Sequence, residues 1–338
     1  MEILYSSSDS YASLTGISIL SLLENNKTDE EINIYIMDNC ISEENKKKLR
    51  YVVESYGKNI YFVPMPDMKA LTGEEIDTRR WNISTFGRLY MAGALPQNVH
   101  KVLNIDCDTI IVGSLEPLWN TDLTGKVLGG MLECINDRYR RNVGAEKGDY
   151  YLNGGIIFLN LDEVRKENYE QQFTDYIKKY GSSLAYLDQD VLNSVVKQDK
   201  KKKLPIEYNT LSIYFYATYE QLLKIRRSKK EDFYSKEEYI NAVEHPVIVH
   251  FTTCFLDGLR PWIVGNQHPL RSRFLEYKAM SPWADMPLLE DNRSSSKKFC
   301  TKMIRKCPKG LLCSTASMLH GVIVPNRNYK RMKRRIRK

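Results

Sequence analysis

The first third of the chain alternates short apolar segments with stretches of helical spacing, and this alternation constrains the fold more than any other feature of the sequence. Short runs of β-branched and apolar residues predict strands, and apolar residues spaced three or four apart predict the helices between them. The expected strands cover 3–7, 32–37, 59–63 and 102–105, and the expected helices cover 11–25, 42–57 and 85–94. Strands that alternate with helices usually pair in parallel, so the sequence predicts an α/β fold with a parallel sheet covered by helices on both faces.

The second half of the chain is less regular. Apolar segments predict further strands at 127–134, 155–161 and 247–251, and no internal repeat is present. Two runs of charged residues, 200–203 and 226–230, are expected on solvated loops or at helix ends, because unpaired charges are costly to bury.

The net charge of +8 is distributed unevenly along the 338 residues. Residues 293–338 contain 15 Lys or Arg and no Asp or Glu, which leaves 35 basic against all 42 acidic residues in 1–292. The sequence therefore predicts a mildly acidic domain over 1–292, followed by a strongly basic tail over 293–338.

The basic tail has three interpretations. Binding to an anionic membrane surface is favoured, because Lys and Arg are attracted to anionic lipids and the semi-apolar stretch 311–324 can lie in the interface. A disordered, solvated tail is the second interpretation, and salt-sensitive nucleic-acid binding is the third. No specific nucleic-acid partner is expected, because the acidic domain offers no extended basic face.

Targeting and cysteine signals favour the cytoplasm. No apolar stretch is long enough to span a bilayer, and Glu2 with the polar run 6–10 does not fit a signal peptide. The seven cysteines form no CxxC pair and do not fit a secreted disulfide framework. We therefore expect a cytoplasmic protein, peripheral at the inner face of the cell membrane.

Several common signatures are absent from the sequence. It contains no GxGxxG, no GxxxxGK[ST], no HExxH and no GxSxG. Dinucleotide-binding, P-loop, zinc-protease and hydrolase interpretations therefore lose their usual support.

The central motif is LNIDCDT, in which Asp106 and Asp108 follow an apolar strand. Residues i and i+2 of an extended segment point to the same side, so the two carboxylates would repel each other unless a cation lies beside them. Carboxylate oxygens suit Mg²⁺ or Mn²⁺, which can bridge them to a diphosphate. His250 ends the predicted strand 247–251, and it is either a buried structural histidine or a third ligand that favours Mn²⁺.

Two neighbouring motifs have both structural and functional interpretations. The chain holds a second DxD, Asp188-Gln189-Asp190, but the first is preferred for metal because α/β sheets bind ligands at strand ends. Asp188 could instead cap a helix. Asn153-Gly154 could be a hairpin turn, or a site where the backbone approaches a ligand and the amide bonds sugar hydroxyls.

In their order and context these motifs resemble glycosyltransferase family 8. The resemblance covers about residues 1–270 and rests on the segments SSSDSYA (6–12), STFGRLY (84–90), LNIDCDTIIVGSLEPLW (103–119), YYLNGGIIFLNL (150–161), LDQDVLN (187–193) and HFTTCFLDGLRPW (250–262). It implies a GT-A fold, with a Rossmann-like, mixed but mainly parallel sheet, in a catalytic domain over 1–292. It also implies a retaining hexosyltransferase that uses Mn²⁺ (or Mg²⁺) and a nucleotide sugar, usually a UDP-sugar, with a glycan or glycolipid as acceptor.

The same resemblance implies a role for each site residue. The metal would be held by Asp106, Asp108 and His250. The nucleotide and phosphates of the donor would meet Ser6, Ser8, Ser10, Arg88, Cys107 and Arg260. The donor sugar would meet Asn153, Gly154, Asp188 and Gln189. Asp188 and Gln189 would be the catalytic residues, since they would stabilise positive charge at the anomeric carbon.

The sequence departs from the family pattern at two places. Ser8 stands where many relatives have Asp, and Arg260 replaces a Lys within a segment that is longer than in the best-known relatives. A sugar nucleotidyltransferase is the alternative enzyme class, but it would normally carry a Gly-rich loop with Lys or Arg, which 6–10 lacks. A non-enzymatic protein that binds nucleic acid through its tail is the third class. No oligomeric state is predicted.

Overall fold

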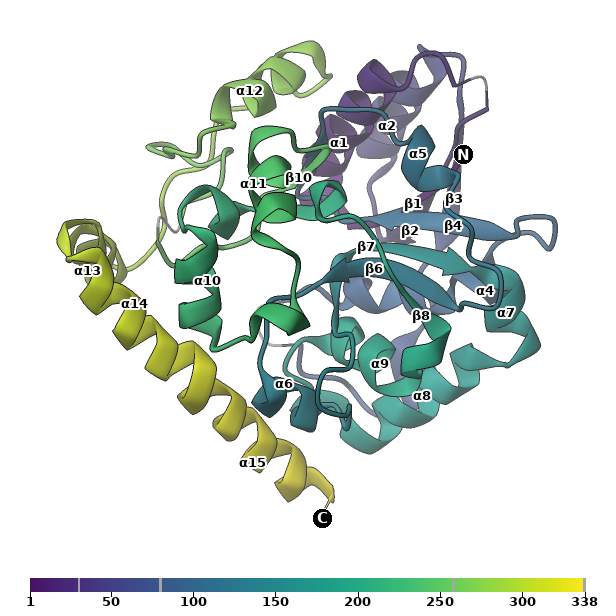
Figure 1. Ribbon diagram of the computed structural model, residues 1–338. Coiled ribbons are helices and arrows are strands. Elements are labelled where there is room, and N and C mark those ends of the chain that lie inside the picture. Colours follow the sequence, from purple (N-terminus) through teal and green to yellow (C-terminus); the bar gives the residue numbers. More distant parts are fainter. Residues whose placement is uncertain (30, 79–80, 257–258, 337–338) are drawn as a thin grey trace.

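The computed structural model describes residues 1–29, 31–78, 81–256 and 259–336 (Figure 1). At its centre is a seven-stranded sheet with the strand order β3-β2-β1-β4-β7-β6-β8. The strands are β1 (Glu2–Ser8), β2 (Asn33–Asn39), β3 (Asn59–Pro64), β4 (Lys101–Ile105), β6 (Leu128–Leu132), β7 (Leu152–Asn160) and β8 (Lys201–Lys203).

Neighbouring strands of this sheet pair in parallel, except that β7 is antiparallel to both β4 and β6. Parallel strands need long connections, which α1 (Ala12–Asn25) and α2 (Glu43–Glu54) supply between the first three strands. Figure 1 shows these helices on one side of the sheet and α8 (Tyr169–Tyr180) and α9 (Leu187–Val195) on the other. The predicted α/β fold with a mainly parallel, mixed sheet is confirmed.

The main core fills the space between the sheet and these helices. Ile3, Ile34, Leu103 and Phe158, each from a different strand, are completely buried. Burying a side chain of this size stabilises the fold by about 1.5–3 kcal/mol. The core therefore holds the strands rigidly, and with them the polar residues that follow the strand ends.

A second, three-stranded sheet has the order β5-β10-β9 and begins just after the turn that ends β4. Its strands are β5 (Thr109–Ile111), β9 (Thr210–Leu211) and β10 (Ile248–His250). Strand β10 is antiparallel to β5 and parallel to β9. Because His250 pairs with Thr109, the end of β10 lies beside the Asp106–Asp108 motif.

The remaining helices of the body are short and lie around the two sheets. The α-helices are α3 (Met68–Thr72), α4 (Met91–Ala94), α5 (Glu116–Trp119), α6 (Asp137–Asn142), α7 (Leu161–Lys166), α10 (Tyr219–Arg226), α11 (Lys236–Glu244) and α12 (Arg271–Met280). The 3-10 helices are η1 (Asp9–Tyr11), η2 (Ile83–Tyr90), η3 (Gly181–Ser183), η4 (Gln198–Lys200), η5 (Ile206–Asn209), η6 (Ser212–Phe215) and η7 (Lys230–Asp232).

Two local expectations need correction. The helix predicted over 85–94 is mostly the 3-10 helix η2, and only its last turn is α-helical. The charge run 200–203 is not a solvated loop, because β8 pairs along β6 at the edge of the sheet. Lys201 is buried, and its Nζ donates to the carbonyls of Tyr150 and Asn193, which compensate for its desolvation.

The C-terminal segment (residues 293–336) consists of α13 (Ser295–Lys306), α14 (Lys309–Met318), the π-helix η8 (Leu319–Ile323) and α15 (Val324–Ile336). It forms the long yellow arm at one side of the molecule in Figure 1. Within the described residues, no helix is both long and apolar enough to cross a membrane.

Contacts with the body hold the C-terminal segment in place. Asn136 Nδ2 donates to the Gly321 carbonyl at 3.1 Å, and Arg227 Nε donates to Ser317 Oγ at 2.9 Å. Arg331 donates to two carbonyls of the body, and Met332 is buried. Residues 309–336 are therefore a packed helical element, which does not fit the disordered-tail interpretation.

Candidate active site

Three metal-ligand side chains converge where β4, β5 and β10 meet. Asp106 and Asp108 lie in the turn between β4 and β5, and His250 ends β10. His250 Nε2 lies 3.1 Å from Asp108 Oδ1 and 3.6 Å from Asp106 Oδ2. One ligand atom from each residue lies within 4.8 Å of the other two, so a single cation can contact all three. These residues are called the acid–imidazole cluster below.

The donor set of this cluster fits a divalent cation. Carboxylate oxygens suit Mg²⁺ and Mn²⁺, and the imidazole nitrogen shifts the preference towards Mn²⁺. Burial alone would raise the pKa of Asp108, but the positive neighbours His250 and Arg260 lower it to about 2. The Asp108 carboxyl is therefore ionised and available to a cation at any physiological pH.

Arg88, on η2, lies between the cluster and the second acidic motif. Its guanidinium pairs with Asp106, contacts the Gly154 carbonyl and lies 3.2 Å from Asp188 Oδ2 through Nε. Burial raises the pKa of Asp188 to about 6, although the Arg88 charge opposes that shift. Arg88 thus connects the residues predicted to hold the metal to those predicted to meet the donor sugar.

The predicted sugar-binding residues lie together at the start of β7 and of α9. The Gly154 N–H donates to Gln189 Oε1 at 2.8 Å. Asn153 and Gly154 both belong to β7, so Asn153-Gly154 is part of a strand rather than a hairpin turn. Asp188 lies inside the first turn of α9, where Tyr186 is the N-cap residue. Asp188 is therefore not the N-cap residue of this helix. Asp190 faces away, because it accepts from Tyr151 and from two backbone amides.

The serines of the first loop lie at the C-terminal end of β1. Ser8 Oγ lies 3.2 Å from Ser10 Oγ and accepts a hydrogen bond from Asn82 Nδ2 at 3.0 Å. Cys107 Sγ donates to the Ser6 carbonyl, which ties this loop to the acid–imidazole cluster. Ser6 Oγ is buried without a hydrogen-bond partner among the described residues. A buried hydroxyl without a partner is costly, which fits a position that a ligand completes.

Arg260 reaches the cluster from the segment after β10. Its guanidinium lies 3.2 Å from Asp108 Oδ2 and 5.3 Å from the centre of the Trp262 ring. Residues 257 and 258, part of the longer segment that precedes it, lie outside the described residues. A guanidinium beside a carboxylate that can bind a cation is placed to bind the same anionic ligand.

Sequence reasoning missed two residues behind the cluster. Asn209, at the end of η5, lies with Oδ1 3.0 Å from His250 Nδ1, and its Nδ2 donates to Asn153 Oδ1. Glu133, just after β6, accepts from Asn153 Nδ2. Neither residue stands in a recognisable motif, and only the pairing of β9 with β10 brings Asn209 to the histidine.

The close packing of β7 on His250 gives a first prediction. A Cβ added at Gly155 would lie 2.2 Å from His250 Cε1, well inside van der Waals contact. Gly155→Ala should therefore displace the imidazole and weaken Mn²⁺ binding at least about 10-fold, the range seen when ligand support is lost. Manganese titration followed by electron paramagnetic resonance measures this. Gly113→Ala is the control, because its Cβ would meet Val247 at an ordinary 3.4 Å. Equal Mn²⁺ affinity in both variants would contradict the prediction.

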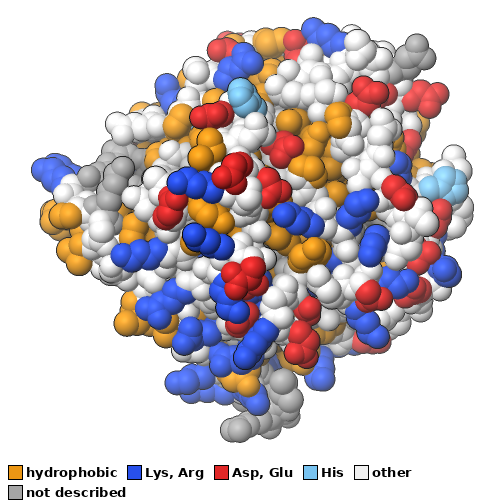
Figure 2. All heavy atoms as spheres, in the orientation of Figure 1, with side chains coloured by type: hydrophobic (Ala, Val, Ile, Leu, Met, Phe, Trp, Pro, Cys, Tyr) orange, Lys and Arg blue, Asp and Glu red, His pale blue; other side chains and the backbone are white. Residues whose placement is uncertain are grey.

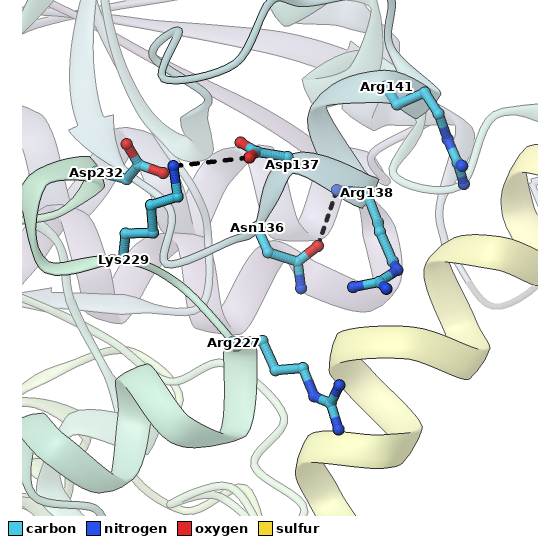
Figure 3. Close-up of a pocket in the computed structure, with 7 residues that line it drawn as sticks. All are labelled: Asn136, Asp137, Arg138, Arg141, Arg227, Lys229 and Asp232. Carbon is cyan, nitrogen blue, oxygen red and sulfur yellow. Dashed lines mark hydrogen bonds and ion pairs between the residues drawn. The ribbon is translucent and has the colours of Figure 1, made fainter.

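A separate pocket of about 340 Å³ lies between α6 and residues 227–232, which follow α10 (Figure 3). Its lining side chains are mainly basic and comprise Asn136, Asp137, Arg138, Arg141, Arg227, Lys229 and Asp232. None of the predicted site residues is among them. The pocket is therefore distinct from the acid–imidazole cluster, and its positive charge adds to that of the C-terminal segment.

Comparisons with known proteins agree with this fold. A Haemophilus influenzae protein named as a glycosyltransferase is 32% identical over 202 residues, which cover 58% of this chain and 59% of that protein. The lipopolysaccharide 1,3-galactosyltransferase of Salmonella typhimurium is 24% identical over 85% of this chain and 80% of its own length. The solved galactosyltransferase LgtC, in complex with donor and acceptor sugar analogues, matches with a TM-score of 0.68 and 21% identity, over 89% of this chain and all of LgtC.

Together, the fold and these relatives define a glycosyltransferase with a GT-A fold. The sequence profile of Glycosyl transferase family 8 matches residues 2–263, and this chain belongs to that family. The family assignment made from the motifs is confirmed, and both a nucleotidyltransferase and a non-enzymatic nucleic-acid-binding protein are ruled out as the overall class.

Proposed function

We propose that this enzyme transfers a hexose from a nucleotide sugar, most simply a UDP-sugar, to a glycan or glycolipid acceptor with retention of anomeric configuration. The observation that carries the proposal is the acid–imidazole cluster, with Arg88 paired to Asp106 and Arg260 paired to Asp108. Such a cluster, next to buried polar residues, suits a donor of this chemical class. The named activities of the lipopolysaccharide galactosyltransferase and of LgtC support a hexosyl donor.

Each predicted site residue has a role in this proposal. Asp106, Asp108 and His250 would hold Mn²⁺ or Mg²⁺, and when bound such an ion neutralises negative charge on the departing diphosphate. Arg260 would bind the same phosphates through its planar guanidinium. The loop with Ser6, Ser8, Ser10 and Cys107 would meet the nucleotide. The donor sugar would lie against Asn153, Gly154, Asp188 and Gln189.

The contacts of Asp188 and Gln189 favour attack from the front face of the sugar. Arg88 holds Asp188, and an amide such as Gln189 is a poor nucleophile. We infer that the acceptor oxygen bonds to the anomeric carbon on the face from which the diphosphate departs. The bond from that carbon to the phosphate oxygen breaks, and the leaving phosphate takes the proton of the acceptor. Asp188 and the Gln189 carbonyl would stabilise the positive charge that develops.

A screen of nucleotide sugars tests the proposal. We expect slow hydrolysis of one UDP-sugar without acceptor, dependent on Mn²⁺ or Mg²⁺ and abolished by a chelator. Nuclear magnetic resonance should show that the sugar is first released with the anomeric configuration of the donor. Release of pyrophosphate from UTP and a sugar phosphate, with no donor hydrolysis, would contradict the proposal.

We further propose that the C-terminal segment binds an anionic membrane surface at the cytoplasmic face, beside the catalytic domain over 1–292. Large apolar side chains on it are 45–63% exposed: Phe299, Met303, Leu311, Met318, Leu319 and Ile323. The segment contributes no acidic residue, and each Lys or Arg near anionic lipid adds about 1 kcal/mol. In Figure 2, basic side chains gather along the edge of the molecule formed by this segment.

Charge reversal tests the membrane proposal without removing packed helices. Changing the exposed Lys297, Lys298 and Lys302 of α13 to Glu should weaken binding to phosphatidylglycerol vesicles at least about 10-fold. Donor hydrolysis in solution should be unchanged. The matched control changes three exposed lysines of the body, Lys47, Lys178 and Lys224, to Glu. Equal vesicle binding by the two triple variants, measured by sedimentation, would contradict the proposal.

A further inference from the structure

A chain of buried polar side chains leads away from His250 on the side opposite the acidic residues. Asn209 Oδ1 lies 3.0 Å from His250 Nδ1, and Asn209 Nδ2 donates to Asn153 Oδ1 at 2.9 Å. Asn153 Nδ2 then donates to Glu133 Oε2 at 2.5 Å. His250, Asn209 and Asn153 are 5%, 2% and 8% exposed, so these contacts are sheltered from water.

The direction of these hydrogen bonds is fixed at the end far from the histidine. The backbone N–H of Gly155 can only donate, and it donates to Asn153 Oδ1 at 2.9 Å. Glu133 Oε2 accepts the amide hydrogen of Asn153, which agrees with that orientation. The Gly155 N–H therefore sets the orientation of the Asn153 amide.

That orientation determines the next two side chains in turn. The Asn153 oxygen faces Asn209, so the NH₂ group of Asn209 donates to it. The oxygen of the Asn209 amide therefore points towards His250. An amide oxygen can only accept a hydrogen bond, so Nδ1 of His250 must carry a proton. Without a cation, Nε2 also carries a proton, because His250 is the positive neighbour that bonds Asp108. When a cation replaces that proton, the retained Nδ1 proton leaves the ring lone pair on Nε2, the atom that faces Asp106 and Asp108.

We propose that Asn209 is a positioning residue, which holds His250 in the Nδ1-protonated tautomer and so directs the Nε2 lone pair into the metal site. This inference rests on the proposed function, because it assigns a role toward the proposed cation. Metal-binding histidines commonly donate their other ring N–H to such a partner, and loss of that partner costs about 10–100-fold in metal affinity. The Asn153 oxygen is then occupied by this chain, which leaves one amide hydrogen of Asn153 for a donor sugar.

Substitutions at Asn209 separate this positioning role from a purely structural one. Asn209→Leu removes the acceptor and should weaken Mn²⁺ binding about 10–100-fold, measured by electron paramagnetic resonance of free Mn²⁺. Asn209→Asp keeps an oxygen that accepts from His250, but it places its second oxygen against the oxygen of Asn153. It should therefore lose thermal stability while it keeps Mn²⁺ affinity close to that of the wild type. If the Leu variant does not fold, Asn209→Ser replaces it. The Ser side chain is too short to reach the imidazole ring, so this variant should also bind Mn²⁺ more weakly.

Asn26→Leu is the matched control. Asn26 is 4% exposed, and its side chain hydrogen-bonds the backbone of Leu22 and Leu115, away from the cluster. It should lose stability without a change in Mn²⁺ affinity. Wild-type Mn²⁺ affinity in folded Asn209→Leu or Asn209→Ser would overturn the proposal.

A second readout does not depend on metal binding. In ¹⁵N-histidine-labelled wild-type protein without metal, Nδ1 of His250 should carry a proton, with the assignment taken from His250→Gln. That proton signal should disappear in Asn209→Leu. An unprotonated Nδ1 in the wild type would overturn the inference. Failure of the wild type to bind Mn²⁺ would count against the proposed function alone.

Discussion

Asp108→Asn should reduce Mn²⁺-dependent hydrolysis of the donor by three orders of magnitude or more. Asp108 contributes one carboxylate to the acid–imidazole cluster and contacts both His250 and Arg260. The amide has almost the same shape but carries no charge, so it cannot balance a divalent cation or hold Arg260 through an ion pair. Electrostatic stabilisation of a leaving group commonly supplies several kcal/mol, and each 1.36 kcal/mol is worth about 10-fold in rate.

The comparison for this variant is a carboxylate of the second DxD motif. Asp190 accepts from Tyr151 and from the amides of Ala185 and Tyr186, and it does not face the cluster. Asp190→Asn should cost stability but keep Mn²⁺ affinity at the wild-type value. The rate of UDP release at saturating Mn²⁺, with folding checked by circular dichroism, measures the loss in Asp108→Asn. Undiminished turnover in that variant would exclude Asp108 as a metal ligand.

Arg88→Met should have the second-largest effect, on both activity and stability. Arg88 is buried and contacts Asp106, Asp188 and the Gly154 carbonyl, so its loss leaves two carboxylates without their cation. Breaking a buried ion pair in this way costs about 3–5 kcal/mol. We expect donor turnover to fall at least about 100-fold, because both the metal ligand Asp106 and the sugar-facing Asp188 lose their positions.

The matched control for Arg88 is Arg140, which is 2% exposed and pairs with Asp137 and Asp232 beside the separate pocket. Arg140→Met should unfold at a similarly reduced temperature but keep the kcat of the wild type. Thermal denaturation and donor hydrolysis, measured on both variants, separate the two effects. If Arg88→Met kept wild-type kcat while losing stability, its role would be structural only.

The N-terminal half of the fold could be predicted because local patterns and tertiary structure agree there. Alternating apolar strands and helices can pair in few ways, so the ends of β1 and β4 were placed correctly from sequence. The convergence of His250 with Asp106 and Asp108 came from family resemblance rather than local pattern. It depends on β10 pairing with β5 across a long sequence separation, which no local signal encodes.

The expectations and alternatives that the structure does not match have a common physical cause. Lys201–Lys203 have the local chemistry of a loop, but they form a strand because β8 pairs with β6. Asn153-Gly154 left a hairpin turn open as an alternative, but both residues belong to β7, next to an irregularity in its pairing with β6. The basic C-terminal segment has the composition of a solvated tail, yet Cys313 and Ala316 pack in one buried cluster with Ile225 of the body, and Met332 is buried as well. In each case tertiary contacts outweighed local propensity.

The hydrogen-bonded side chains that lead from His250 through Asn209 to Glu133 could not be predicted from the sequence for a different reason. They come from η5, β7, β10 and the residue that follows β6, and single asparagines in such places are common in any sequence. Their meaning arises only from the hydrogen-bond directions that a fixed backbone donor imposes.

The most direct test of the central claim is calorimetric titration of UDP into the wild-type enzyme with Mn²⁺ and with a chelator. If Asp106, Asp108 and His250 hold a cation that binds the donor diphosphate, UDP should bind only in the presence of Mn²⁺. Asp108→Asn should then bind no UDP under either condition. Equal UDP affinity with and without the metal would contradict the account.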